Sequence, residues 1–284
     1  MKQITTTMRI QQGRPLTDST AVMWLKDILR PILSKVSGMW IPYKISVACP
    51  CQQISGKPII LAVNHGCFAD TPIMVRIAPE RPYILSGTQR LQFTDWLYFL
   101  LTGVIFVDRK DKQDTAAAKQ AMIAYLRKGR SILMFPEGTW NLTPAQLMMP
   151  MKWGCIEVAQ QSGAQIIPVG LDYDRNEHIC RVRFGQPMAG EMLENKLEAI
   201  RALRDTMAAL RWEMMCSQPV LHRGEITPEL LQEEMYQAIQ EYPPLNWKYE
   251  SSYIYHPETE LGEVFAHLGH LQPRRENAWL FRNT

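Results

Sequence analysis

The sequence predicts an α/β fold: a mixed, mostly parallel sheet flanked by helices, with an N-terminal amphipathic helical segment and a C-terminal helical extension. Short, almost wholly apolar runs alternate with segments of helical periodicity between residues 58 and 217. Apolar runs without a polar face are typical of strands covered on both sides, as in sheets built from strand–helix–strand units. The 284 residues are 46% hydrophobic and 21% charged, which suffices for a large core and excludes a disordered composition.

The first periodic segment, residues 19–41, predicts an amphipathic helix, and Pro31 is expected to kink it or divide it into two helices. Its apolar positions recur at helical spacing, at Val22, Leu25, Ile28, Leu29, Ile32, Leu33, Val36, Met39 and Trp40. Lys26, Arg30 and Lys35 interrupt these positions. Two interpretations stay open: the helix packs on the core, or it lies in a membrane interface with its basic side chains reaching toward lipid phosphates.

The later elements follow in strict alternation. Strands are predicted at residues 58–63, 82–86, 104–107, 131–135, 165–171 and 180–184. Helices are predicted at residues 71–78, 94–101, 114–128, 152–162 and 190–217, with another helix starting at 227–229. Gly129 and Gly163 are expected to end two of these helices, since glycine suits the residue after a helix. The expected organisation is an N-terminal amphipathic helical segment (1–42), an α/β domain (43–212) and a C-terminal extension of unknown role (213–284).

Composition excludes several classes of protein. The net charge of +3 suits an anionic surface weakly and is far below that of a nucleic-acid-binding protein. The six cysteines show no disulfide or zinc spacing, which favours a reducing, cytoplasmic setting. The first twenty residues hold no apolar leader, and no uninterrupted apolar run reaches about 18 residues. We therefore expect neither a secretory signal nor a transmembrane helix.

A histidine and an aspartate follow the strand predicted at 58–63. His65 lies at the strand end, where α/β folds place their sites, and Asp70 is five residues further on. A carboxylate at that spacing can turn back to the imidazole, fix its tautomer and stabilise the imidazolium that forms when the ring takes a proton. The pair predicts a general base, His65, oriented by Asp70. By itself the pattern is weak, because a histidine and an aspartate in a loop are more often structural.

Two further motifs stand at strand ends. Residues 135–139 read Phe-Pro-Glu-Gly-Thr and close the strand predicted at 131–135. A proline, an acid and a glycine at a strand end make a turn that presents a carboxylate and backbone N–H groups at the sheet edge. Arg109 follows the strand at 104–107 in the same way and places a cation there.

Together these motifs resemble those of the glycerolipid acyltransferase family, which includes lysophosphatidate and glycerol-3-phosphate acyltransferases. The matching blocks, in chain order, are Asn64, His65, Asp70 and Pro72; Phe106 and Arg109; Phe135, Pro136, Glu137, Gly138 and Thr139, followed by Lys152 and Gly154; and Ile166, Ile167, Pro168 and Val169. Four blocks in this order are far more specific than any one of them. The resemblance covers roughly residues 44–188.

The resemblance implies that a fatty acyl group passes at a membrane surface from acyl-CoA or acyl carrier protein to the hydroxyl of a lysophospholipid such as 1-acylglycerol-3-phosphate. His65 would remove the hydroxyl proton while Asp70 holds the ring. No acyl-enzyme, cofactor, metal or nucleic-acid partner is implied. The residues implied to bind substrate are Arg109, Glu137, Gly138, Thr139 and Lys152. The two cations among them suit an acceptor phosphate, and Glu137 and Gly138 would shape the acceptor pocket.

The chain departs from the family pattern directly after the third block. Trp140 and Asn141 stand where the family usually has an arginine and a serine. An indole cannot pair with phosphate as a guanidinium does. Either Arg109 and Lys152 suffice for a phosphate, or the acceptor is a hydroxyl or amine of another lipid. In the second case Trp140 would stack on a different headgroup or line the acyl channel.

Other functions remain as alternatives. In an acyl thioesterase, His65 would activate water instead of an acceptor hydroxyl. A catalytically idle acyl- or membrane-binding module would keep the fold, although such a module has no need of a base and its orienting acid. Cys67, beside the histidine, is a possible nucleophile, but a buried and inert thiol is the commoner case. His178 and Cys180 lack the further ligands that a metal site requires.

Overall fold

The structure is a computed structural model that describes residues 3–5, 19–38, 41–52, 56–78, 82–87, 90–92, 101–109, 111–141, 146–218, 223–230 and 232–233. By its internal contacts the chain divides into two units, Met1–Pro243 and Pro244–Thr284. All of the described residues belong to the first unit. The domain boundaries expected at 42 and 212 stay predictions, although the last long helix runs through position 212.

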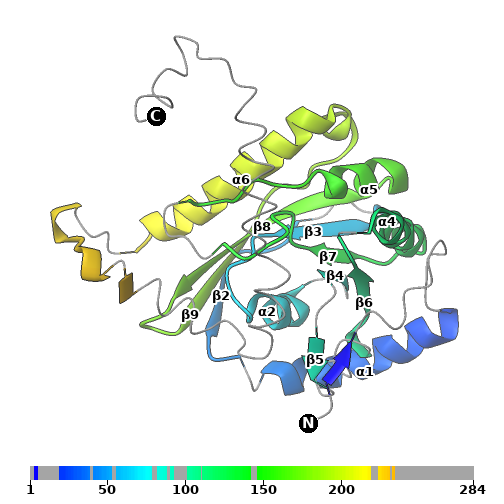
Figure 1. Ribbon diagram of the computed structural model, residues 1–284, viewed down its shortest axis with the longest axis horizontal. Helices are drawn as coiled ribbons and strands as arrows, with labels where there is room; N and C mark the ends of the chain where they lie inside the picture. The colour runs from blue at the N-terminus through cyan, green and yellow to red at the C-terminus, as the bar shows by residue number, and fades with distance from the viewer. Residues whose placement is uncertain are drawn as a thin grey trace. The chain divides into compact units, whose positions relative to one another are not determined.

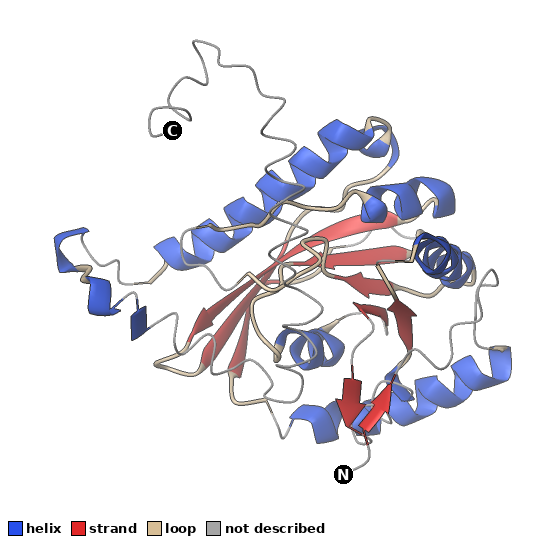
Figure 2. Cartoon of the chain, viewed as in Figure 1, coloured by secondary structure: helices blue, strands red, loops and turns tan. Residues whose placement is uncertain are grey.

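A seven-stranded sheet forms the centre of the first unit (Figure 2). From one edge to the other its strands are β2 (Lys44–Cys49), β9 (Ile179–Phe184), β8 (Gln165–Asp174), β3 (Ile59–Val63), β7 (Ile132–Met134), β4 (Tyr83–Gly87) and β6 (Val104–Val107). Every neighbouring pair is parallel except β8 and β9. The prediction of a mixed, mostly parallel sheet is therefore confirmed.

Helices cover both faces of this sheet. Figure 1 shows α4, α5 and α6 on one side and α2 on the other. The described helices are α1 (Thr20–Gly38), α2 (Asp70–Ile77), α4 (Lys112–Arg127), α5 (Gly154–Ser162), α6 (Lys196–Cys216), and the 3-10 turns η2 (Gly190–Leu193) and η3 (Arg223–Glu225). Two short strands, β1 (Gln3–Thr5) and β5 (Arg90–Gln92), pair antiparallel apart from the main sheet. Parallel strands need such crossover helices, which explains the helical layers.

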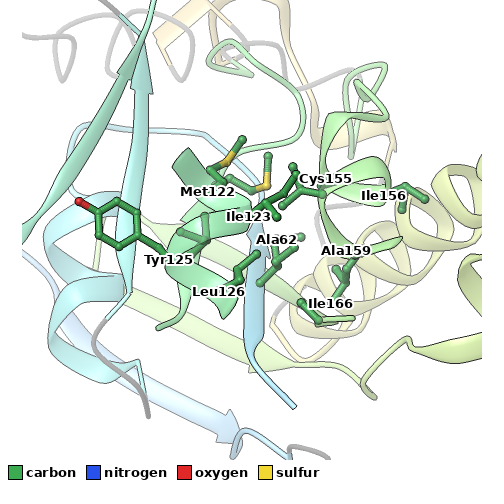
Figure 3. Close-up of a cluster of buried hydrophobic side chains, with 14 of the residues drawn as sticks. Ala62, Met122, Ile123, Tyr125, Leu126, Cys155, Ile156, Ala159 and Ile166 are labelled. Carbon is green, nitrogen blue, oxygen red and sulfur yellow. The ribbon is translucent and has the colours of Figure 1, made fainter. Parts of the chain in front are cut away.

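The strands are apolar throughout because both of their faces are buried. In β3, all five residues are at most 1% exposed. Alternate side chains point to opposite faces of a strand, so Ile60 and Ala62 join the cluster under α4, α5 and α6, whereas Leu61 and Val63 join the cluster under α2. Figure 3 shows part of the first cluster. Burial raises the pKa of the Cys155 thiol in this cluster to about 12, which keeps it protonated and inert.

Several predicted bounds differ from the structure. Strand β8 continues to Asp174, three residues beyond the predicted end at Leu171. The helix predicted from 190 divides into η2 and α6, because the Asn195 side chain caps α6 by accepting hydrogen bonds from the N–H groups of Leu197 and Glu198. Strand β2 was not predicted. The helix predicted at 94–101 lies almost wholly outside the described residues.

Helix α1 runs through Pro31 as one element, so of the two expected effects of Pro31, a kink or a division into two helices, the division does not occur. Within the described residues, no helix is both long enough and apolar enough to cross a membrane. One side of α1 contacts the rest of the unit: Met23 is buried, and Asp27 accepts a hydrogen bond from Arg130 at 2.7 Å. A second set of apolar side chains is exposed, and we call it the α1 stripe: Trp24, Leu25, Ile28 and Ile32, between 48% and 64% exposed.

Candidate active site

The loop after β3 is held against β8 by one side chain. Asn64 is 3% exposed, and its amide makes two hydrogen bonds to the backbone of Leu171: the side-chain oxygen accepts from the N–H at 2.6 Å, and the side-chain nitrogen donates to the carbonyl at 3.1 Å. The side-chain amide thus pairs with β8 in the way that one more residue of β3 would. The next residue, His65, is consequently placed at the carboxyl edge of the sheet beside the centre strands.

His65 and Asp70 form the expected pair. The His65 Nδ1 lies 2.7 Å from the Asp70 Oδ2, and the Asp70 side chain is fully buried while that of His65 is 17% exposed. The same carboxylate oxygen accepts from the backbone N–H groups of Gly66 at 2.7 Å and Cys67 at 3.0 Å. Asp70 is also the first residue of α2, where helix geometry favours a negative charge. These donors all suit an ionised aspartate, which orients the ring and leaves Nε2 as the nitrogen that can take a proton.

The residues at the end of β7 close over the imidazole. The Phe135 ring stacks on the His65 ring with centroids 3.9 Å apart and planes 13° from parallel. The Trp140 ring lies 5.2 Å from the imidazole at 59°. Two aromatic rings therefore limit the imidazole to one orientation, in which only a part of it meets solvent.

Glu137 connects this turn to the histidine loop. It is 3% exposed, and its two carboxylate oxygens accept hydrogen bonds from the backbone N–H of His65 at 3.0 Å and of Met149 at 2.7 Å. Burial raises the pKa of Glu137, while these two hydrogen bonds act in the opposite direction. The buried carboxylate therefore holds the histidine loop and the segment at Met149 together, and we call it a bracket between these two loops.

Two cations flank Gly138. This glycine has φ 74°, and an added Cβ would lie 3.3 Å from the Arg109 Nη1 and 3.3 Å from the Lys152 Cε. Arg109 donates a hydrogen bond to the Gly138 carbonyl, and the Lys152 N–H donates to the Pro136 carbonyl at 2.9 Å. Both cations are exposed, as is Thr139. The turn thus brings the exposed side chains of Arg109 and Lys152 together beside Gly138.

Asn141, the second departure from the family pattern, ties the chain together after the turn. Its backbone N–H donates to the His65 carbonyl at 2.6 Å, and its side-chain nitrogen donates to the Gln146 carbonyl at 2.9 Å. An amide that reaches across the loop in this way gives a structural reason for an asparagine at this position.

The structure brings the predicted residues of three separate motifs to one edge of the sheet: His65, Asp70, Arg109, Glu137, Gly138 and Lys152, with Thr139 beside them. It also adds a residue that the motifs do not contain. Tyr173, near the end of β8, donates a hydrogen bond from its hydroxyl to the Asp70 Oδ1. Strand alternation was the signal that could have found it, since Val169, Leu171 and Tyr173 share the face that α2 covers.

Comparison with known proteins places this site in a family. The profile of the family described as Acyltransferase matches residues 44–172, which include every residue of the site except Tyr173. The 1-acyl-sn-glycerol-3-phosphate acyltransferase of Saccharomyces cerevisiae is 26% identical over 212 residues, which cover 69% of this chain and 68% of that protein. The protein of the same description from Borreliella burgdorferi is 27% identical over 168 residues, which cover 58% of this chain and 66% of that protein. These comparisons support a place for this chain in the glycerolipid acyltransferase family.

Members of this acyltransferase family differ in their acceptors. The lyso-ornithine lipid O-acyltransferase of Pseudomonas aeruginosa is 24% identical to this acyltransferase over 151 residues, which cover 51% of this chain and 57% of that protein. The crystal structure of the 1-acyl-sn-glycerophosphate acyltransferase of Thermotoga maritima matches the fold with a TM-score of 0.56 and 14% identity, over 69% of this chain and 83% of that one. The α/β architecture of the acyltransferase is thus also that of a solved structure.

Proposed function

We propose that this acyltransferase moves a fatty acyl group from an acyl thioester, acyl-CoA or acyl carrier protein, to the hydroxyl of a lysophospholipid such as 1-acylglycerol-3-phosphate, with His65 as the general base. The observation that carries the proposal is the 2.7 Å contact between His65 Nδ1 and a fully buried Asp70 carboxylate. A binding module has no use for an imidazole whose tautomer is set in this way.

The proposed reaction is a direct transfer. Nε2 of His65 takes the proton from the acceptor hydroxyl as its oxygen forms a bond to the thioester carbonyl carbon. The imidazolium that results is stabilised by the ionised Asp70. When the tetrahedral intermediate collapses, the C–S bond breaks and the leaving thiolate receives the proton from the imidazolium. The histidine is then neutral again, and no covalent acyl-enzyme forms.

The cations beside Gly138 support a phosphate on the acceptor. A phosphate monoester carries close to two negative charges, and paired guanidinium and ammonium donors suit it. In the proposal, Arg109 and Lys152 bind this phosphate while Gly138 lets the backbone approach it closely, because any larger side chain would contact both cations. Thr139 adds a hydroxyl at the same surface, and Glu137 holds the turn in place from behind.

The α1 stripe supports action at a membrane surface. Trp24, Leu25 and Ile28 are each about half exposed or more, although they are large apolar side chains. The opposite side of α1 is bound to the domain through Met23 and Asp27, so the stripe points away from the core to which the helix is attached. An apolar helix face of this kind suits insertion at the boundary of headgroups and acyl chains, where both acceptor and product reside.

Two observations favour a second acceptor. Trp140 contacts His65 and stands where the family usually has an arginine, and one relative is described as a lyso-ornithine lipid O-acyltransferase. A lipid hydroxyl whose headgroup lacks a phosphate monoester is therefore the alternative acceptor for the same catalytic pair.

The test is acceptor-dependent release of thiol. The purified protein is incubated with a long-chain acyl-CoA, and separately with acylated carrier protein, in the presence of 1-acylglycerol-3-phosphate, lyso-ornithine lipid or no acceptor. We expect thiol release with 1-acylglycerol-3-phosphate and a loss of about 10²-fold or more in His65→Ala, as for removal of a general base. Thiol release without any acceptor would instead indicate a thioesterase, and release with lyso-ornithine lipid alone would assign the second acceptor.

A further inference from the structure

We propose that Tyr173 is a positioning residue for catalysis, holding the Asp70 carboxylate from the side opposite His65. Its hydroxyl donates a hydrogen bond to the Asp70 Oδ1, whereas His65 contacts the Oδ2. The inference rests on the proposed role of His65 as general base, and it adds a third residue, 103 positions away from Asp70 in the chain. Tyr173 itself acts on the substrate only through the aspartate.

The fold brings Tyr173 to this position by extending β8 beyond its neighbour. The last residue of β3, Val63, pairs with Val169, and β8 continues from there to Asp174. Along this extension the Asn64 side chain holds Leu171, two residues before the tyrosine. Side chains two residues apart share a face of the strand, so Tyr173 projects on the side of the sheet that carries α2, whose first residue is Asp70.

The ring of Tyr173 is fixed by its neighbours. It packs edge-on against Tyr43, with ring centroids 4.9 Å apart and planes at 64°, and its backbone pairs with Cys180 of β9. Burial, and then the negative charge of Asp70, raise the pKa of the Tyr173 hydroxyl well above its ordinary value. The hydroxyl therefore keeps its proton at neutral pH and remains a hydrogen-bond donor.

With Tyr173, both oxygens of Asp70 have donors. The Oδ2 accepts from His65, Gly66 and Cys67, and the Oδ1 accepts from the tyrosine. A carboxylate held at both oxygens cannot rotate about its Cβ–Cγ bond, so it presents one fixed lone pair to the imidazole. The tyrosine also draws part of the negative charge toward Oδ1, which weakens the pull of Asp70 on the proton at His65.

Among the described residues, two thiols lie beside Asp70 and Tyr173. Cys67 lies in the loop before Asp70 and Cys180 on β9, and both thiols are buried. Burial raises the pKa of Cys180, so this thiol stays neutral. The neighbour of Asp70 that changes charge during the proposed reaction is therefore His65, whose backbone N–H is in turn held by Glu137.

The experiment is a double-mutant cycle with Tyr173→Phe and Asp70→Asn. The phenylalanine keeps the ring packing and removes only the hydroxyl. We expect Tyr173→Phe to lower kcat by about 10-fold, with KM for both substrates changed by less than about twofold, because mutations of groups that orient a catalytic side chain commonly cost 10-fold or more. In the Asp70→Asn background the same substitution is expected to lower kcat by less than about twofold. Equal losses in both backgrounds would show that the hydroxyl does not act through Asp70, which would overturn the inference.

A second measurement separates positioning from general loss of structure. Without the tyrosine hydroxyl, more negative charge faces the imidazolium, so the acid limb of the kcat/KM profile is expected to move to higher pH. A merely structural effect would scale the whole profile without moving it. Tyr43→Phe is the matched control, since it removes a hydroxyl from the same aromatic pair and leaves the Tyr173 hydroxyl in place; its acid limb is expected to stay where it is.

The titration of His65 can also be followed directly through its ring NMR signals. In Tyr173→Phe their midpoint is expected to move to higher pH, and an unchanged midpoint would overturn the inference. This measurement needs no substrate. If no acceptor supported acyl transfer, the proposed function would fail, while the effect of Tyr173 on the His65–Asp70 pair would still be decided by the titration.

Discussion

Glu137 allows a sharp test of how the acceptor turn supports the histidine loop. Its carboxylate accepts one N–H bond from His65 at 3.0 Å and one from Met149 at 2.7 Å, and the side chain is 3% exposed. Glu137→Gln has almost the same shape, but it offers one oxygen and one NH₂ group. Whichever way the amide is oriented, one of the two backbone N–H groups faces another donor instead of an acceptor.

The magnitude follows from two opposing contributions. A buried N–H that loses its acceptor costs about 1–3 kcal/mol. Burial raises the pKa of Glu137, so the ionised carboxylate is itself costly to bury, and the neutral glutamine recovers a part of that cost. We therefore expect a net destabilisation of about 1–2 kcal/mol. For a domain of this size the corresponding fall in Tm is about 2–8 °C.

Thermal unfolding and kcat are measured together on Glu137→Gln. We expect kcat to fall by about 10-fold, because release of the His65 N–H lets the imidazole leave its productive position. The control is Glu194→Gln. Glu194 is exposed on the turn before α6, so this variant makes the same chemical change at a surface position. If Glu137→Gln matched wild type in both Tm and kcat, the carboxylate would not be holding the two loops together.

Two further predictions concern the surface of the domain. Lys119 of α4 and Lys196 of α6 donate hydrogen bonds to Glu157 and lower its pKa. These contacts therefore stabilise the fold above the ordinary glutamate pKa, and the stabilisation is lost as the pH falls through the lowered pKa of Glu157. Glu157→Gln is expected to lower the unfolding free energy by less than about 1 kcal/mol at pH 7, and urea unfolding should show the difference vanishing in acid; a difference that grew in acid would contradict this assignment. In the α1 stripe, the double variant Trp24→Ser, Ile28→Ser is expected to bind phosphatidylglycerol-containing vesicles about 10-fold more weakly, or weaker still, in a co-sedimentation assay. The control, Trp212→Ser, changes a 56% exposed tryptophan on α6 and should have little effect on this binding. Equal binding of the α1 variant and wild type would remove the stripe from the membrane contact.

The strands that are buried on both faces were predictable because burial forces them to be apolar. β3 and the first part of β8 are examples, and in each case the predicted start lies within one residue of the observed one. β2 was missed because it is an edge strand, mostly exposed, in which Lys44 and Ser46 interrupt any apolar pattern. The last residues of β8 were missed for a related reason: Asp172 and Asp174 are polar, and their strand pairing with β9 is invisible in a local pattern.

The site was predictable where its residues lie close together in sequence. His65 and Asp70 are five residues apart, and their contact follows from one loop. The contact between Tyr173 and Asp70 depends instead on how far β8 extends past β3, which is a property of the assembled sheet. The bracket role of Glu137 likewise depends on Met149, whose N–H becomes its partner only after the chain has returned to the turn.

Asn141 connects the histidine loop to the chain at Gln146. The backbone N–H of Asn141 donates to the His65 carbonyl, and the Asn141 side chain donates to the Gln146 carbonyl. The two ends of the intervening segment are therefore joined independently of what lies between them. Lengthening a segment tied in this way costs little, about 0.6 kcal/mol for each doubling. Insertions between Asn141 and Gln146 are therefore expected to leave the contact between His65 and Asp70 unchanged.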